Sequence, residues 1–464
     1  MSEFFNQTIT ELVAEYEAMV EMGAMTFLEE SSLNRLIEYY ELDDQLDRAL
    51  EVTALAVRQH QFSGEFRIKQ AELLLAENRL EEALECLDQA AFFMPNEAEL
   101  ELLRAEALIY RTQYQEALCI LEVLKPTADS RLLSDIYFIE ALAFDQQEMH
   151  ERMYFSLRAA LTENPDNRSA LERIWYSIDA CKRYDESIEL FDRILEHNAY
   201  ASRGWFNLGH ARAYQGDYAD AIDCYEYAYL SDEHFEQAYR DCAELCFEMK
   251  HYHRALRCYE ELLERFDSDN DILLHIGLCH QHLGNFKIAS TFYVQALNYD
   301  PMDDEVLFRI GECFAHEQNW REAIRYYNKA IAIEETREEY YGALAQAYYQ
   351  YGALEEAEYC FGQAIETAPE DSRYWVQYAL FLLRTQRGEE ALDLLEDAEH
   401  TAVGPELTYC RVGCLFLTGR RQEGLYRLGE ALEEDYNGHH FLFGLQADLE
   451  YDPDIISMIS AYMM

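Results

Sequence analysis

One column of mostly small residues recurs along the chain at intervals of 34 positions. Its members are Ala49, Ala83, Ala117, Met153, Ser187, Ala221, Ala255, Ala289, Ala323, Ala357, Ala391 and Gly424, and the interval changes only before Met153, to 36, and before Gly424, to 33. A fixed period of this length is the signature of a stacked repeat, in which each copy buries its apolar face against the next.

Two helical patterns run in step with this column. A large apolar residue follows the small one by four positions and a second small residue follows by three more, as in Tyr225 and Ala228. Spacings of four and three place these residues on one face of a helix. Upstream, a large, an aliphatic and a small residue recur, as in Trp205, Leu208 and Gly209. The pattern predicts pairs of helices whose small residues permit close approach.

Turn residues separate the two helices of each pair. Gly216 and Gly284 lie between the patterns and supply the left-handed backbone conformation that ends a helix. An Asp or Asn follows them and begins the next helix. Four prolines share one phase of the repeat, where the second helix must stop: Pro95, Pro165, Pro301 and Pro369. Because Pro (7) and Gly (19) are scarce along the chain and helix-forming residues are plentiful, the whole chain is predicted to be helical.

A Trp-x2-Leu-Gly start, an Ala-x3-aromatic step, a further Ala and a closing Pro in a period of 34 resemble the tetratricopeptide repeat. Residues 202–235 match that pattern best, and about twelve copies cover residues 30–437. The resemblance implies an all-α, right-handed superhelical α-solenoid of tandem helix-turn-helix repeats. We expect residues 1–29 to form an N-terminal capping helix and residues 438–464 to form C-terminal capping helices, because end repeats otherwise expose an apolar face.

Three copies depart from the pattern. The first has a weak turn at Asp43-Asp44. The copy around Ala117 is followed by two extra residues near Lys125-Pro126, which predicts irregular packing there. In the last copy the turn at Gly419 is one residue shorter, so its geometry is expected to differ.

Charge restricts the classes of partner. The 464 residues include 90 acidic and 37 basic side chains, for a formal charge of −53. Binding of nucleic acid needs a basic stripe, and an anionic membrane repels such a chain, so we expect neither as a partner. No apolar run reaches the length of a membrane span, and the first residues do not form a secretory signal. We therefore expect a cytoplasmic protein whose 12 cysteines are reduced.

Candidate chemistry is sparse. Twelve repeats leave no residues for a catalytic domain, and the phosphate-loop, dinucleotide and zinc-protease motifs are missing, so we expect no enzyme, no cofactor and no metal. Cys242 and Cys246, four residues apart and followed by Cys258, could suggest zinc, but they fall at core phases of their repeat. On the helix that follows, His275 and His282 share a side whereas His280 points elsewhere, which argues against a shared ion.

Function is therefore expected on a surface. In the tetratricopeptide family the first helix of each pair lines a concave groove, and this resemblance implies the following partner-binding residues: Glu38, Glu72, Glu106, Phe138, Tyr176, Arg203, Phe206, His210, Tyr214, Arg240, Glu244, Phe247, Phe308, Glu312 and Tyr349. The family members that clamp chaperone tails use Lys, Arg and Asn at these places. The acidic Glu38, Glu72 and Glu106 argue against that kind of clamp.

The sequence thus predicts a protein-interaction scaffold or adaptor that binds a peptide or protein in its groove. A basic or amphipathic segment fits the alternation of acidic and apolar groove positions. Three alternatives stay open: a self-assembling solenoid whose cap helices pair, a regulator that senses a small ligand or peptide in the groove, and an acidic row that is merely a solvated face. The sequence leaves the oligomeric state open.

Overall fold

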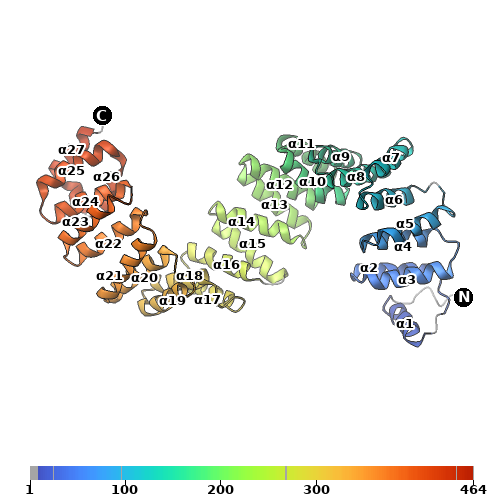
Figure 1. Ribbon diagram of the computed structural model, residues 1–464, viewed down its shortest axis with the longest axis horizontal. Helices are drawn as coiled ribbons and strands as arrows, with labels where there is room; N and C mark the ends of the chain where they lie inside the picture. The colour runs from blue at the N-terminus through green and yellow to red at the C-terminus, as the bar shows by residue number, and fades with distance from the viewer. Residues whose placement is uncertain (1–8, 24–25, 96, 267–268, 446, 463–464) are drawn as a thin grey trace. The chain divides into compact units, whose positions relative to one another are not determined.

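The computed structural model describes residues 9–23, 26–95, 97–266, 269–445 and 447–462. In these residues all regular structure is helical, and the helices form antiparallel pairs as in a tetratricopeptide solenoid (Figure 1). The chain divides into two compact units, residues 1–238 and 239–464. The right-handed sense of the superhelix, and the division into an array with two caps, stay predictions. None of the described helices has the length and apolar run that a bilayer crossing requires.

The first unit contains six helix pairs after its first helix. Its helices are α1 (Ile9–Met22), α2 (Glu30–Leu42), α3 (Leu46–Gln59), α4 (Glu65–Ala76), α5 (Leu80–Ala91), α6 (Ala98–Tyr110), α7 (Tyr114–Leu124), η2 (Lys125–Thr127), α8 (Ser130–Asp145), α9 (His150–Glu163), α10 (Arg168–Cys181), α11 (Tyr184–His197), α12 (Ser202–Gln215) and α13 (Tyr218–Ser231). Even-numbered helices of these pairs are the first helices of the predicted repeats, and odd-numbered helices are the second.

The second unit continues the same alternation. Helix α14 (Glu236–Glu248) begins just before it, and α15 (Tyr252–Arg265), α16 (Asn270–His282), α17 (Phe286–Ala296), α18 (Asp304–His316), α19 (Trp320–Ile333), α20 (Glu338–Tyr351), α21 (Leu354–Thr367), α22 (Ser372–Arg384), α23 (Gly388–Ala398), α24 (Pro405–Leu417), α25 (Arg421–Glu434), η3 (Tyr436–Gly438), α26 (His439–Leu445), η4 (Ala447–Tyr451) and α27 (Pro453–Tyr462) follow.

Each pair turns through a residue with positive φ, five positions before the small column. Gly216, Gly284, Gly352 and Gly419 take this conformation in four copies, and eight other copies place a residue other than glycine there. Asp44, in the turn that looked weak, has φ of 55°, and Gly419, in the shortened one, has φ of 82°. The Asp217 amide donates to the Arg212 carbonyl at 3.0 Å, which closes the turn as in a Schellman motif. Both departures from the sequence pattern therefore keep the common turn.

Inside each pair, residues 16 positions apart fill one shared space. A Cβ on Gly209, Gly277 or Gly311 would lie 2.3–2.7 Å from ring atoms of the tyrosine 16 residues later. The sizes are reversed in the first copy, where Ile37 faces Thr53 and both are buried. In these four copies a small residue of one helix therefore leaves room for a larger residue of the other.

The insertion after Ala117 forms the short helix η2, and α8 then begins with Asp129 accepting a hydrogen bond from the Leu132 amide at 2.8 Å.

At the N-terminal end, the buried ring of Tyr16 in α1 packs edge-on against Tyr40 of α2. Residues 1–8 of the predicted capping helix 1–29, Phe5 among them, lie outside the described residues. At the other end, α27 packs on α25.

The C-terminal contact is strengthened by Arg421, whose guanidinium reaches both Asp452 and Asp454 at 2.7 Å. The hydrogen bonds from Arg421 lower the pKa of Asp452 to about 2. The last helix is therefore held by charge as well as by its apolar face.

Candidate functional site

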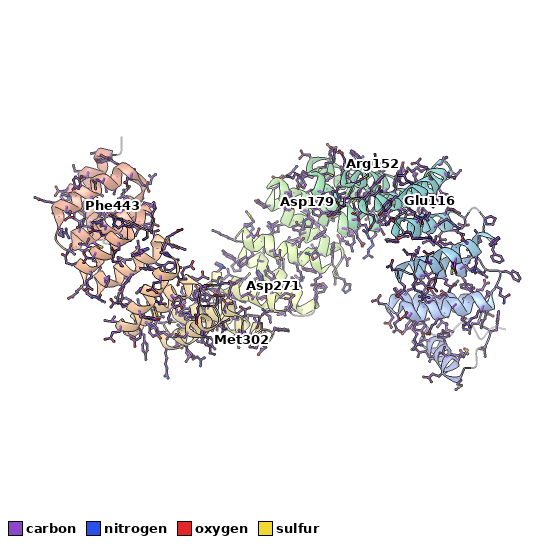
Figure 2. All side chains as sticks on the ribbon, in the orientation of Figure 1. Glu116, Arg152, Asp179, Asp271, Met302 and Phe443 are labelled. Carbon is purple, nitrogen blue, oxygen red and sulfur yellow. The ribbon has the colours of Figure 1, made fainter. Side chains whose placement is uncertain are left out.

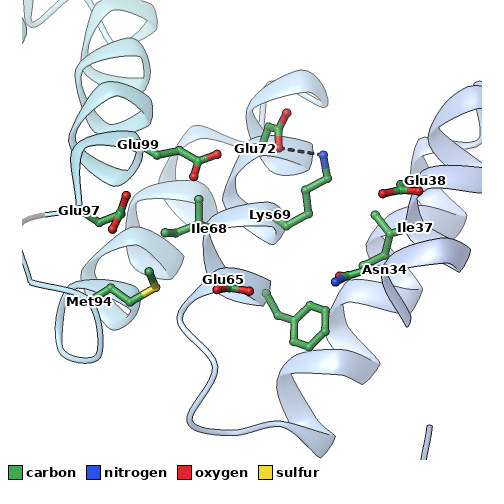
Figure 3. A pocket seen from close by; sticks show the side chains of 11 residues that line it. Asn34, Ile37, Glu38, Glu65, Ile68, Lys69, Glu72, Met94, Glu97 and Glu99 are labelled. Carbon is green, nitrogen blue, oxygen red and sulfur yellow. Dashed lines mark hydrogen bonds and ion pairs between the residues drawn. The ribbon is translucent and has the colours of Figure 1, made fainter. Parts of the chain in front are cut away.

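A cavity of about 480 Å³ opens on the first-helix face of the first unit. Helices α2, α4 and α6, together with the segment before α6, contribute its lining: Asn34, Ile37, Glu38, Glu65, Phe66, Ile68, Lys69, Glu72, Met94, Glu97 and Glu99 (Figure 3). Asn34 and Ile68 occupy one repeat position, and Glu38 and Glu72 occupy another. The cavity therefore follows the register of the repeat.

Five carboxylates and one ammonium group line this cavity. Lys69 donates to Glu41 at 2.8 Å and to Glu72 at 2.9 Å, so its charge is already matched. In the part of the chain that the structure describes, Glu65, Glu97 and Glu99 have no cation within ion-pair distance. Figure 3 shows these carboxylates around the side chains of Ile68 and Lys69. The cavity is left with an excess of negative charge.

Burial and mutual repulsion act on these groups. Burial raises the pKa of Glu99, and the negative charges of Glu72 and Glu97 raise it further. Burial alone would lower the pKa of Lys69, but its hydrogen bonds with Glu41 and Glu72 outweigh burial, and the pKa lies above its ordinary value. A carboxylate whose charge is disfavoured in this way gains most from an added cation.

Sequence reasoning identified part of this lining. Glu38 and Glu72 were predicted, whereas Glu65, Lys69, Met94, Glu97 and Glu99 were not. Met94 and Glu97 lie in the connection between α5 and α6, outside the helical register that guided the prediction. The signal that could have found them is the loop phase itself, because a connection at the groove edge adds side chains to it.

Glu106 continues the predicted row on α6 but does not line the cavity. Burial raises its pKa, a hydrogen bond from Tyr110 at 3.4 Å opposes that shift, and the Glu72 charge adds to it. Phe138 on α8 is half-buried between two core clusters. Phe138 therefore contributes to packing, and Glu106 lies outside the cavity.

Phe206, His210 and Tyr214 of α12 belong to an aromatic group with Trp175 of α10 and Tyr184 of α11, whereas Tyr176 of α10 meets His150 edge-on. His210 stacks on Trp175 with centroids 4.8 Å apart, and Phe206 meets His210 edge-on at 4.5 Å. Tyr214 stacks on Tyr184 at 4.7 Å. Burial lowers the pKa of His210 to about 4, so its ring is neutral and acts as an aromatic surface. Trp175 stands where most other copies have a small residue, which is why it was missed.

Polar partners fix the edges of this group. Tyr184 donates to Asp179 at 2.7 Å; Figure 2 labels that aspartate. Arg203 pairs with Glu172 at 2.8 Å and covers the Phe235 ring. Tyr176 and Tyr214 keep more than half of their surface exposed. Both tyrosines are therefore accessible to a partner.

In the second unit most of the predicted residues contact neighbouring side chains. Arg240 pairs with Asp269 at 2.7 Å, Glu312 pairs with Arg309 at 3.0 Å, and Glu244 is exposed. Phe247 contacts His275 and His282, and Tyr349 meets Phe381 edge-on. All of these contacts are within a repeat or between neighbouring repeats.

Phe308 corrects the sequence prediction. Its ring was expected to offer an exposed face to a partner, but only 6% of its surface is exposed. It stacks on Tyr340 with centroids 4.6 Å apart and contacts Tyr327 at 5.4 Å. The physical reason is that large aromatic rings from its own repeat and from the next close over the position. Phe308 is a core residue.

Cysteine and histidine lie as the helical geometry predicted. Cys242, Cys246 and Cys258 are buried, with the sulfurs of Cys242 and Cys258 3.8 Å apart. His275 and His282 both contact Phe247, whereas His280 is buried against Phe292. Among the described residues, no group of three or more His, Cys, Asp or Glu side chains is placed to hold a metal ion.

Comparisons with known families agree with the repeat. Models of the tetratricopeptide repeat match residues 202–235 and residues 314–376. A model of the coatomer epsilon subunit matches residues 243–332. A TPR repeat-containing protein of Pseudomonas aeruginosa is 32% identical over 163 residues, which are 33% of this chain and 26% of that protein. The match thus spans about a quarter of the relative's length.

Solved structures give weaker likenesses. YrrB, described as a TPR protein with an unusual peptide-binding site, has a TM-score of 0.36 at 19% identity, covering 42% of this chain and 97% of that one. MamA from Desulfovibrio magneticus RS-1 has a TM-score of 0.34 at 19% identity, covering 36% and 94%. The Cut9–Hcn1 hetero-tetramer of the APC/C gives 0.37 at 12% identity, covering 99% of each chain. TM-scores this low carry nothing from those proteins to this one.

The constant helix-pair register, the common turn and the two matched repeat segments agree with one another. The chain is a tetratricopeptide-repeat protein.

Proposed function

We propose that this chain is an interaction scaffold that binds a Lys- or Arg-bearing segment of a partner protein in the cavity between α2, α4 and α6. Tetratricopeptide repeats generally mediate protein–protein interactions. The observation that supports this partner chemistry is the cavity of about 480 Å³ in which, among the described residues, Glu65, Glu97 and Glu99 have no cation within ion-pair distance. A bound ammonium or guanidinium would relieve their repulsion and form charge-assisted hydrogen bonds.

Apolar contacts complete the proposed site. Ile68 and Met94 line the cavity beside the carboxylates, so the aliphatic stem of a lysine can pack while its ammonium reaches an acid. Tyr176 and Tyr214, which lie further along the same unit, supply exposed rings for additional side chains of a long segment. The partner is therefore proposed to be basic and amphipathic, and not simply a polycation.

Titration calorimetry with a synthetic peptide of Lys and Leu tests this proposal. Glu65→Gln, Glu97→Gln and Glu99→Gln together should weaken binding about tenfold, because each removes one charge-assisted contact. This variant leaves the Lys69 pairs with Glu41 and Glu72 intact.

A matched control removes three exposed acids from the second helix α11: Glu189→Gln, Asp192→Asn and Glu196→Gln. It changes the net charge by the same amount and should bind nearly as well as the original chain. Equal losses in both variants would mean that the peptide responds only to the overall charge, and the cavity would not be the site.

A further inference from the structure

The outer surface of α17 and α19 in the second unit differs in charge from the other second helices. Three positions, two before, two after and six after the small column, lie four residues apart and therefore on one side of each helix. They hold Lys287, Thr291 and Gln295 on α17, and Arg321, Arg325 and Lys329 on α19. We name these six residues the basic row.

The same three positions are acidic elsewhere. At least one carboxylate occupies them on nine of the ten other second helices, for example Glu81 and Glu85 on α5, or Glu389 and Asp393 on α23. Helix α17 has no acidic residue, and α19 has only Glu322, which is paired with Arg325 at 2.8 Å. The whole chain carries a formal charge of −53, but at these three repeat positions α17 and α19 carry positive side chains where most other second helices carry negative ones.

The cations of the basic row are available. Lys287, Arg321 and Lys329 are exposed, and within the described residues none has a carboxylate at ion-pair distance. Arg325 and Lys329 both lie over the Tyr326 ring, at 4.8 and 5.0 Å from its centroid. Tyr326 in turn stacks on Phe314 of α18, the helix that contacts both α17 and α19. Arg325 and Lys329 therefore lie on an aromatic ring that itself packs against α18.

Apolar side chains accompany these charges. Ile288 is 45% exposed and Val294 is 48% exposed on α17, and Tyr299 just after this helix is 55% exposed. Phe292 of α17 and Tyr326 of α19 pack against the same core cluster, so one body carries both helices. The surface thus combines unpaired cations with exposed aliphatic and aromatic carbon.

We infer that the basic row, with Ile288 and Val294, is a second docking surface that binds an acidic, amphipathic segment of a protein partner. Charge complementarity selects Asp and Glu, and the exposed aliphatic carbons select apolar side chains between them. A long nucleic acid fits less well, because four cations on two short helices neutralise few phosphates while the rest of the chain repels the backbone. This surface uses the opposite partner chemistry to the first-helix cavity and does not depend on it.

Calorimetry with a synthetic peptide of Glu and Leu tests the inference on the full chain. Lys287→Glu, Arg321→Glu and Lys329→Glu together should weaken binding at least about tenfold, since three favourable pairs become repulsive. The conservative variant with Lys287→Arg, Arg321→Lys and Lys329→Arg should bind as the original chain does. Thermal melting by circular dichroism should be nearly unchanged, because all three positions are exposed.

A matched control reverses three other exposed cations without a described carboxylate partner: Arg131→Glu, Lys182→Glu and Arg384→Glu. Glu is compatible with the Lys182 turn, because Glu148 takes the same backbone conformation one repeat earlier. This control should retain binding within about twofold. The inference is overturned if the acidic peptide does not bind the original chain, or if both variants lose affinity equally. It is also overturned if the basic row instead captures a single-stranded oligonucleotide or phosphatidylserine vesicles in preference to the peptide.

Discussion

The first-helix cavity of the first unit and the basic row of the second use the same repeat for opposite charges. In the cavity, carboxylates from α4 and the start of α6 outnumber the single ammonium of Lys69. On α17 and α19, cations replace the acids that most other second helices carry. The helices beneath both surfaces pack through the same small-and-large columns, from Ala71 with Leu87 to Gly311 with Tyr327. In a solenoid of this kind, packing columns set the scaffold and the remaining positions set what it binds.

The largest expected effect is a loss of stability, and it tests whether the repeat position that lines the cavity in the first unit is buried at Phe308 in the second. Phe308 occupies the repeat position of Asn34, which is exposed in the cavity, but the Phe308 ring is buried between Tyr327 and Tyr340. Phe308→Ala should therefore lower the free energy of unfolding of the second unit by about 3–5 kcal/mol. Urea unfolding followed by circular dichroism measures this loss.

Tyr214→Ala is the comparison for that experiment, because its ring is 57% exposed on a first helix. It should cost less than about 1 kcal/mol. If the two changes shift the unfolding transition equally, Phe308 is not part of the core, and the cavity position remains a surface position in the second unit.

Much of the fold could be predicted because a single period repeats it. The small column located twelve turns, including the one at Asp44 whose local sequence looked weak, since neighbouring repeats impose the same turn. The sides of α16 that carry His275 and His280 followed from helical geometry alone. Phe308 was predicted to be exposed because its position in the tetratricopeptide repeat indicates only which side of the helix faces the groove. That position does not indicate whether a ring from the next repeat, here Tyr340, covers the Phe308 side chain.

The candidate sites were less predictable, for two different reasons. Glu97 enters the cavity from the connection between α5 and α6, and the prediction considered only positions on the first helices. The basic row could have been found from the sequence, because Lys287 and Arg321 lie 34 residues apart at a phase where acids prevail. It was missed because the family directs attention to first helices.

An intermediate effect separates packing columns from surface positions. A Cβ on Gly277 would lie 2.3 Å from the Tyr293 ring, so Gly277→Ala should destabilise the second unit by about 1–3 kcal/mol. Gly362, inside α21, has no atom within 4 Å of an added Cβ, and Gly362→Ala should stabilise by about 0.5–1 kcal/mol. Thermal melting of both variants measures the contrast. Two changes of the same sign would refute the assignment of Gly277 to a packed column, while binding of both test peptides should persist in each folded variant.

The smallest effect distinguishes the two surfaces by pH. Burial, together with the charges of Glu72 and Glu97, raises the pKa of Glu99, so its carboxylate takes up a proton in milder acid than an ordinary glutamate does. The folded chain therefore binds this proton more tightly than the unfolded chain, and the penalty for the charged form is relieved as pH falls through the raised pKa.

A bound lysine favours the charged form, so affinity for the Lys–Leu peptide should fall by about two- to fivefold as pH drops through the pKa of Glu99. Glu99→Gln should lower the affinity at neutral pH and flatten this profile. The basic row contributes no carboxylate to the binding of the Glu–Leu peptide, because all of its charged residues are Lys or Arg. Its affinity should decline only where the peptide's own carboxylates titrate, near their ordinary pKa of about 4.3. Coincident pH profiles for the two peptides would mean that the raised pKa of Glu99 does not govern binding, because the cavity and the basic row would then respond to one shared change in net charge.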